Sequence, residues 1–342
     1  MGTHSAPRVG IKDVAQTAGV SIGTVSNVLN RPEAVSPPTR ALVMSVIDSL
    51  GYVRLAGARQ LRGNASSQLL ALYGADVTDP RDAALAAGVG QAAEEAGLGV
   101  LMCGGGRGPG RVRDDLALFA SHQVRGVVIT GFAETERMAA ACIERGVTCV
   151  VAGQAPATAD TCSVTVEDHA GGRIAAAHLI AQGHRSIAVI GDPGTGPTLR
   201  RYQGAVERLR EPHGRTVRVT ELATAEVSVG AGRDAGQRLL GVAPRPTAVL
   251  CLHDLLALGL MQALHEAGVR MPHDVAVTGY EDLAFAASAM VPLTSVRWPA
   301  HSVGMRAGRL LIEHTAQEAH EHVHEVLAPE LVVRRSTLSP RA

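Results

Sequence analysis

The segment from residue 11 to residue 30 restricts what this chain can fold into more than any other stretch. Its first apolar side chains recur at helical spacing, at Ile11, Val14, Ala15 and Ala18. Gly19 interrupts this pattern, and Ser21 is a suitable N-cap for a second helix. A third helix is expected after Ser36 and Pro37, because proline is tolerated in a first helical turn. Two short helices joined by a glycine turn, with a third closing the core, predict a helix-turn-helix unit.

The second of these helices has an outward face as well as an apolar one. Val25, Val28 and Leu29 face the expected core, and the outward residues are Ile22, Gly23, Ser26 and Asn27. In helix-turn-helix proteins this outward face enters the major groove, where base edges display distinguishable donors and acceptors. Ile22 can contact a thymine methyl group and Asn27 can pair with adenine, whereas Gly23 has no side chain to read a base. The alternative is an ordinary three-helix packing unit.

The charge is distributed unevenly along the 342 residues. The formal net charge is zero, but residues 1–63 hold seven basic and three acidic residues, which makes this segment +4 and the remainder −4. A basic unit on an acidic remainder fits a DNA-binding head, although the signal is weak alone. The five cysteines form no CxxC pair, and no apolar run is long enough for an export signal or a membrane span. We therefore expect a soluble cytoplasmic protein that does not contact a membrane.

From residue 69 onwards, short apolar runs alternate with amphipathic helical stretches. The first set of runs comprises Leu69–Tyr73, Gly99–Cys103, Gly126–Thr130 and Val147–Ala152. The second set comprises Ser163–Val166, Ile187–Ile190, Ala248–Leu252 and Val275–Thr278. Strands separated by helices predict βαβ units with parallel sheets, and two successive sets predict two similar α/β lobes.

The segment 11–30 also resembles the head of LacI/GalR repressors, whose first helices follow the pattern DVAxxAGVSxxTVSxVLN. Further matches to that family are His178-Leu179, Gly183-His184-Arg185, Arg201 with Gly204, Asp254 with Ala257 and Gly259, Gly279–Asp282, Pro292–Val296 and Leu331–Thr337. The resemblance covers the whole chain. It implies a small all-α head joined by a hinge helix to a two-lobed α/β body like that of periplasmic binding proteins.

The resemblance also implies domain boundaries. The head is expected at residues 1–53, the hinge at 54–66, and the effector-binding and dimerisation body at 67–342. The first lobe takes about residues 67–161 and 297–322, and the second lobe about 162–292 and 323–337. In the hinge, Ala58 and Leu61 match positions that enter the minor groove, with Leu61 as a wedge that kinks the DNA. A flexible linker is the alternative for this segment.

Contacts with the DNA backbone are also implied by the resemblance. Thr24, Asn30, Thr39 and Arg40 are placed for phosphates, which orient the protein without reading sequence. The family often has an arginine where Asn27 stands, so we expect fewer direct base contacts than is usual.

A ligand is expected in the cleft between the lobes, beyond the carboxyl ends of the strands. The candidate residues are Asp76, Asp79, Thr130, Gln154, Arg201, His253, Asp254, Glu281, Asp282 and Trp298. Carboxylates, an arginine and an aromatic ring suit a polyhydroxyl ligand. Three alternatives stay open: Asp254 as a helix N-cap alone, Arg201 as a solvated helix residue, and Trp298 as hinge packing. Many relatives carry glutamine at the Trp298 position and asparagine at the His253 position.

Together these features predict a transcriptional repressor that binds double-stranded operator DNA as a homodimer and responds to a sugar or related small molecule. Induction and corepression both stay open. The alternative is a sugar-binding transport component that shares only the body. An enzyme is disfavoured, because the sequence offers no nucleophile–base set and no phosphate-binding loop. Residues 19–23 match GxSxG by letter only, with a helix where that motif needs a strand. We expect no catalytic residue, no metal site and no cofactor.

Overall fold

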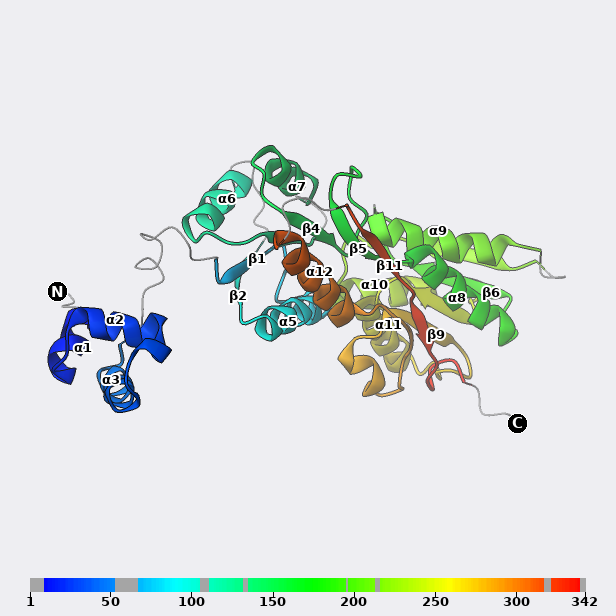
Figure 1. Cartoon of the computed structure of the whole chain (residues 1–342). Helices are drawn as coiled ribbons and strands as arrows, with labels where there is room; N and C mark the ends of the chain where they lie inside the picture. Colours follow the sequence, from blue (N-terminus) through cyan, green and yellow to red (C-terminus); the bar gives the residue numbers. More distant parts are fainter. Residues whose placement is uncertain are drawn as a thin grey trace, which may run out of the picture. The chain divides into compact units, whose positions relative to one another are not determined.

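A computed structural model of the chain describes residues 9–52, 67–104, 111–131, 135–194, 196–212, 216–316 and 321–338. The chain divides into two compact units, residues 1–66 and 67–342, which are described separately below (Figure 1). The whole hinge expected at 54–66, including Ala58 and Leu61, lies outside the described residues, and its DNA contacts stay a prediction. Among the described helices, none is long and apolar enough to cross a membrane.

The first unit contains the expected three-helix arrangement. Its elements are α1 (Ile11–Ala18), α2 (Ile22–Asn30), the short 3₁₀ helix η1 (Pro32–Ala34) and α3 (Pro37–Leu50). The turn between α1 and α2 passes through Gly19 at φ 64°, a left-handed conformation that glycine adopts without strain. The Ser21 hydroxyl accepts a hydrogen bond from the Thr24 amide at 3.0 Å, so it caps α2 as predicted. Val14, Val25 and Val43 are fully buried and bring one face of each helix into a common core.

The first sheet of the second unit is entirely parallel, with strand order β11-β5-β4-β3-β1-β2. Its strands are β1 (Leu69–Tyr73), β2 (Gly99–Cys103), β3 (Val127–Ile129), β4 (Cys149–Ala152), β5 (Cys162–Val166) and β11 (His324–Leu327). Its helices are α5 (Pro80–Glu95), α12 (Ala300–Thr315), α6 (Arg111–Ser121) and α7 (Thr135–Glu144). The first two pack against each other, and the other two share a separate core with the sheet (Figure 1).

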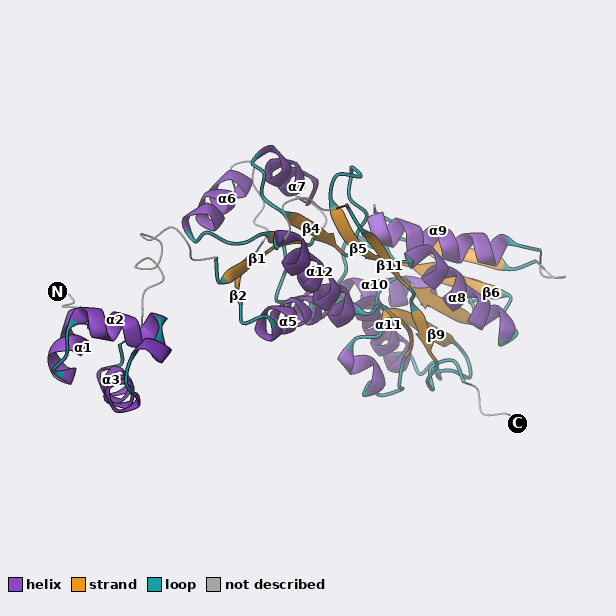
Figure 2. Ribbon diagram, viewed as in Figure 1, coloured by secondary structure: helices purple, strands orange, loops and turns teal. Residues whose placement is uncertain are grey.

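The second sheet has the order β12-β10-β9-β8-β6-β7, and β12 pairs antiparallel in an otherwise parallel sheet. Its strands are β6 (Ser186–Ile190), β7 (Arg218–Leu222), β8 (Ala248–Cys251), β9 (Ala276–Glu281), β10 (Thr294–Arg297) and β12 (Glu330–Val332). Its helical elements are α8 (Asp168–Ala181), α9 (Gly196–Arg210), α10 (Val229–Leu240), α11 (Asp254–Glu266) and the 3₁₀ helix η2 (Ala284–Ala287). Figure 2 shows these helices flanking the strands.

Both faces of the second sheet are covered, which explains its apolar strands. Ile187 and Val189 of β6 join the core formed with α8 and α9, whereas Ala188 and Ile190 join the core formed with α10 and α11. Successive side chains of a strand point to opposite faces, so a strand covered on both faces needs apolar residues at every position. The expected α/β class with two lobes is confirmed.

The assignment of two strands to the second lobe is wrong. Cys162–Val166, expected to open that lobe, pairs with β4 in the first sheet, and β11 joins the same sheet beside it. The chain crosses between the sheets after β5, β10 and β11, and a strand's own residues do not encode which neighbour it pairs with. The edge strand β7 was not predicted, because charged residues such as Arg218 and Glu221 interrupt its apolar pattern.

Candidate functional site

A fully buried arginine, Arg201, makes several polar contacts within the second lobe. Arg201 of α9 donates from Nε to Asp168 Oδ1 at 2.9 Å and from Nη1 to the Leu252 carbonyl oxygen at 2.9 Å. Its guanidinium lies over the ring of Tyr280, 3.9 Å from the ring centre. A buried charge is tolerated only when it is paired and hydrogen-bonded in this way. The buried Nη2 atom makes no hydrogen bond within the described part of the chain, so its two N–H groups are left over.

Glu281 ends β9 and lies among three basic side chains. Its Oε1 is 3.1 Å from His253 Nδ1 and 3.6 Å from Nη1 of both Arg201 and Arg81. Burial raises the pKa of Glu281, but His253, Arg81 and Arg201 together lower it to about 2. The backbone at Glu281 has φ 108°, and Asp282 has φ 53°. Non-glycine residues rarely adopt positive φ, and such strain is concentrated at functional sites.

His253 is the N-cap residue of α11 and is itself buried. Burial lowers the pKa of His253, so the ring is neutral near pH 7. A neutral ring that donates from Nδ1 to Glu281 leaves Nε2 as an acceptor, and the Thr198 hydroxyl lies 3.5 Å from Nε2. The hydrogen bond to Glu281 thus fixes both the tautomer and the orientation of the ring.

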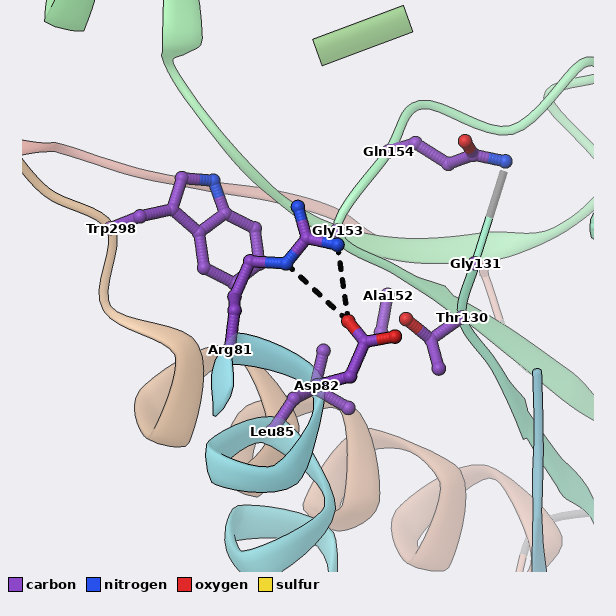
Figure 3. A pocket seen from close by; sticks show the side chains of 9 residues that line it. All are labelled: Arg81, Asp82, Leu85, Thr130, Gly131, Ala152, Gly153, Gln154 and Trp298. Atoms are coloured by element: carbon purple, nitrogen blue, oxygen red, sulfur yellow. Dashed lines mark hydrogen bonds and ion pairs between the residues drawn. The ribbon is translucent and has the colours of Figure 1, made fainter. Parts of the chain in front are cut away.

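The first lobe contributes Arg81 and Asp82, which sequence reasoning missed. Arg81 Nη2 lies 3.1 Å from Asp82 Oδ1 and 3.8 Å from Asp79 Oδ2. The Arg81 guanidinium lies 5.6 Å from the centre of the Trp298 ring (Figure 3). Both residues stand in the first turn of α5, directly after the N-cap Asp79 and Pro80. The sequence did contain a signal for these two residues, namely an Asp-Pro helix start shortly after a strand. The first turn of such a helix lies near the carboxyl ends of the strands, where ligands bind.

Two cavities adjoin these side chains. The first is lined by Arg81, Asp82, Leu85, Thr130, Gly131, Ala152, Gly153, Gln154 and Trp298, and its volume is only about 10 Å³ (Figure 3). That is roughly the space of one water molecule. The second cavity has about 360 Å³ and lies between the start of α5, the segment after β9 and the start of α12. Trp298 lines both, and its buried Nε1 makes no hydrogen bond to a described residue.

The structure brings six of the ten candidate ligand residues to this cleft region: Thr130, Gln154, Arg201, His253, Glu281 and Trp298. Asp79 caps α5 beside Arg81. Asp282 faces the larger cavity and pairs with Arg297 at 2.9 Å and with Arg334 at 2.7 Å. Whether any of them binds a ligand stays a prediction.

The remaining two candidates line neither cavity. Asp76 is exposed and accepts hydrogen bonds from the amide and hydroxyl of Thr78. Asp254 is fully buried, and its carboxylate accepts from the Leu283 amide at 2.8 Å and from the Ser295 hydroxyl at 2.7 Å. It makes no side-chain cap, since the N-cap residue of α11 is His253. Burial raises the pKa of Asp254 to about 7. Asp254 therefore ties the segment after β9 to β10 and α11.

The pairing of Glu281 predicts a pH dependence of stability. Because its folded pKa of about 2 lies below its ordinary value of 4.5, its stabilising contribution is complete above pH 4.5 and is lost as the pH falls towards 2. A Glu281→Gln variant is expected to be less stable than the unchanged protein at pH 7 and to lose less stability below pH 4.5. Urea unfolding between pH 7 and pH 2.5 measures the free energy of unfolding of both proteins as a function of pH. Parallel curves for the two proteins would contradict the lowered pKa of Glu281.

The outward face of α2 in the first unit is exposed as predicted. Ile22 is 46% exposed, Gly23 and Asn27 are exposed, and Ser26 is partly so. Arg40 is exposed at the start of α3. The partly buried hydroxyls of Thr24 and Thr39 hydrogen-bond to Ser21 at 2.9 Å and Ser36 at 2.8 Å, and Asn30 ends α2. Contacts of these residues with DNA stay a prediction.

Fold and site together define a helix-turn-helix protein with a two-lobed binding body. Residues 10–54 match the lacI family of bacterial regulatory proteins, and residues 176–337 match a periplasmic binding protein-like domain. The repressor PurR of Mannheimia succiniciproducens is 30% identical over 334 residues, which cover 95% of this chain and 98% of PurR. The regulator CelR of Thermobifida fusca is 33% identical, with 94% of this chain and 96% of CelR covered. The chain belongs to the LacI family of transcriptional regulators.

Solved structures agree with this assignment over nearly the full length. The Lac repressor dimer bound to operator and the anti-inducer ONPF has a TM-score of 0.83 at 26% identity, covering 97% of this chain and all of that one. The complex of CelR with cellobiose has a TM-score of 0.70 at 32% identity, covering 96% of this chain and all of that one. The predicted family resemblance is confirmed.

Proposed function

We propose that this protein is a transcriptional repressor whose affinity for operator DNA is set by a sugar or a related polyhydroxyl molecule bound between the lobes. The observation that carries the proposal is the pairing of Arg201, whose Nη2 atom is unused, with the Glu281 carboxylate, which lines the larger cavity together with Trp298. Hydroxyl groups can donate to the carboxylate and accept from the guanidinium, while a ring covers an apolar sugar face. The cellobiose bound to CelR and the operator bound to the Lac repressor support both halves of the proposal.

The assembly that we propose is a cytoplasmic homodimer on a near-palindromic operator, because two-fold protein symmetry matches two half-sites. The dimeric Lac repressor supports this arrangement. To switch operator binding almost completely, the effector must favour one state by about 5.5 kcal/mol. The same geometry couples effector and DNA with either sign, so an inducer and a corepressor are both compatible.

Binding rather than turnover is the role that we assign to the cleft. Its carboxylates are engaged with Arg81, Arg201 and His253, an arrangement that can orient a ligand. The relatives are regulators, which supports the same reading. A sugar-binding transport component is disfavoured by the helix-turn-helix unit in the same chain.

The experiment that tests the proposal uses the full-length protein and the DNA upstream of its own gene. Operator affinity is measured at several salt concentrations, alone and with a panel of sugars, amino sugars, sugar phosphates and nucleosides. We expect tight, palindrome-dependent binding that one class of compound changes. Weak binding of equal strength on every DNA fragment, with and without each compound, would overturn the proposal.

Within that assay, Asn27→Ala separates base reading from backbone contact. Asn27 is exposed on the outward face of α2, and one good base pair contact discriminates by about 1–3 kcal/mol. We expect operator affinity to fall by about 5–150-fold while affinity for unrelated DNA stays the same. Arg40→Ala is the matched comparison: loss of a phosphate contact should weaken binding to both DNAs alike and reduce the salt slope by about one. Equal losses on both DNAs for Asn27→Ala would refute its reading role.

A further inference from the structure

A side chain of the protein itself fills one part of the cleft between the lobes, whereas a larger cavity of about 360 Å³, which Arg81 also lines, remains beside it. Only about 10 Å³ remains in the cavity that Arg81 lines with Trp298 and Gln154 (Figure 3). The Arg81 side chain is only 10% exposed, although an arginine in a helical first turn can normally extend into water. A sugar ring needs several times this volume. Arg81 therefore occupies space that a ligand in this part of the cleft would need.

The surroundings of Arg81 are those of a bound planar cation. One side of its guanidinium lies over the Trp298 ring, and its edges point to the carboxylates of Asp82, Glu281 and Asp79 at 3.1, 3.6 and 3.8 Å. An aromatic face together with converging carboxylates is how proteins recognise guanidinium groups. The cleft thus contains a guanidinium niche that the chain's own side chain fills.

This interaction also crosses from one lobe to the other. Arg81, Asp79 and Asp82 belong to the start of α5 in the first lobe, whereas Glu281 ends β9 in the second lobe. Glu281 is held from its own lobe by Arg201 and His253, so its position does not depend on Arg81. The Arg81–Glu281 ion pair is consequently a contact between the two lobes. Packing within either lobe does not supply such a contact.

We propose that Arg81 is a built-in occupant of this part of the cleft: it holds the lobes together without effector, and it must leave before an effector can occupy the niche beside Trp298 and Gln154. The proposal rests on the proposed function, because it takes this cleft to be the effector site. When Arg81 leaves, the carboxylates of Asp79, Asp82 and Glu281 lose a cation, and Asp168 remains paired with Arg201. The cleft then favours an effector rich in donors or carrying a cationic group, and it disfavours sugar acids and sugar phosphates.

Trp298 provides a direct readout, since it is the single tryptophan of the chain and Arg81 lies over its ring. In full-length Arg81→Ala we expect its fluorescence emission to move to longer wavelength, as water enters the vacated niche. Methylguanidinium chloride should reverse this shift with saturation in the millimolar range. Tetramethylammonium chloride and sodium acetate at equal concentration should not, because neither offers a planar set of donors.

The matched comparison is Arg309→Ala. Arg309 lies on α12 and pairs with Glu95 at 2.8 Å, exposed and within the first lobe. This variant and the unchanged protein should show neither the emission shift nor a methylguanidinium response. No response in Arg81→Ala, or the same response in all three proteins, would overturn the proposal.

A second variant covers the case in which Arg81→Ala does not fold. Arg81→Gln keeps part of the stem and removes the charge, so it should show the emission shift without saturable methylguanidinium binding. An unchanged emission spectrum in that folded variant would also overturn the proposal. This proposal and the proposed function can fail separately. If methylguanidinium reverses the emission shift but no compound changes operator binding, only the proposed function is refuted. If a compound changes operator binding but methylguanidinium does not reverse the emission shift, only the role of Arg81 is refuted.

Discussion

Replacement of Arg201 by methionine is expected to lower the free energy of unfolding of the body by about 3–5 kcal/mol. The methionine retains most of the apolar volume, but it leaves Asp168 buried without its partner at 2.9 Å and takes one cation from Glu281. It also frees the Leu252 carbonyl oxygen that Nη1 occupies. Urea unfolding followed by Trp298 fluorescence measures the change, since an unchanged slope with a lower midpoint reports stability alone.

The neighbouring residue supplies the control. Arg200 lies on the same helix and pairs with Glu167 at 3.2 Å, but both side chains are substantially exposed. Exposed pairs contribute about 0–1 kcal/mol, so Arg200→Met should change stability by no more than that. If the two variants were equally stable, burial of the Arg201 network would not be the source of its contribution.

The same substitution tests the binding role. If Arg201 contacts the effector, as we propose, the folded Arg201→Met protein should lose the effector response and keep its operator affinity. The measurement is made at a temperature where unfolding is negligible, so lower stability does not imitate lost binding. Arg201→Lys distinguishes charge from geometry, because lysine keeps the positive charge but lacks the planar fork. A full response in Arg201→Met would remove Arg201 from the ligand site.

Local patterns predicted much of the fold. The stripe at Val14, Ala15 and Ala18 and the cap at Ser21 predicted the head helices, because helical periodicity and capping are properties of adjacent residues. Apolar runs predicted most strands for the same reason. Sheet membership was not predictable in this way: Cys162–Val166 is as apolar as a strand of either sheet, and its partner is set by crossovers distant in sequence.

The site was predicted in part, and the misses have a common physical cause. Arg201, His253 and Glu281 follow strand ends or lie on the next helix, and the general position of ligands beyond such ends identified them. Asp254 also follows a strand end, but its carboxylate turns towards Leu283 and Ser295. Arg81 was missed because its role depends on Glu281, 200 positions later in the chain. Side-chain direction and long-range pairing are not encoded in one short segment.

Two glycines two positions apart in α5 are expected to respond to alanine with opposite signs. At Gly88 a Cβ would collide with the backbone of α12, at the His301 carbonyl oxygen and the Met305 amide nitrogen, whereas at Gly90 nothing lies within 4 Å of it. Gly88→Ala should therefore destabilise the body by about 3 kcal/mol, since neither backbone can move without displacing the packed helices. Gly90→Ala should stabilise it by up to about 1 kcal/mol, because alanine is the better helix former.

The measurement is the urea midpoint of unfolding of each variant, compared with that of the unchanged protein. Because α5 carries Arg81 and Trp298 lies two residues before α12, we expect the close approach at Gly88 to influence the distance between these two cleft side chains. Gly88→Ala should consequently alter Trp298 emission in the folded state, while Gly90→Ala should leave it unchanged. A stabilising or neutral effect of Gly88→Ala would mean that the two helices do not need this close contact.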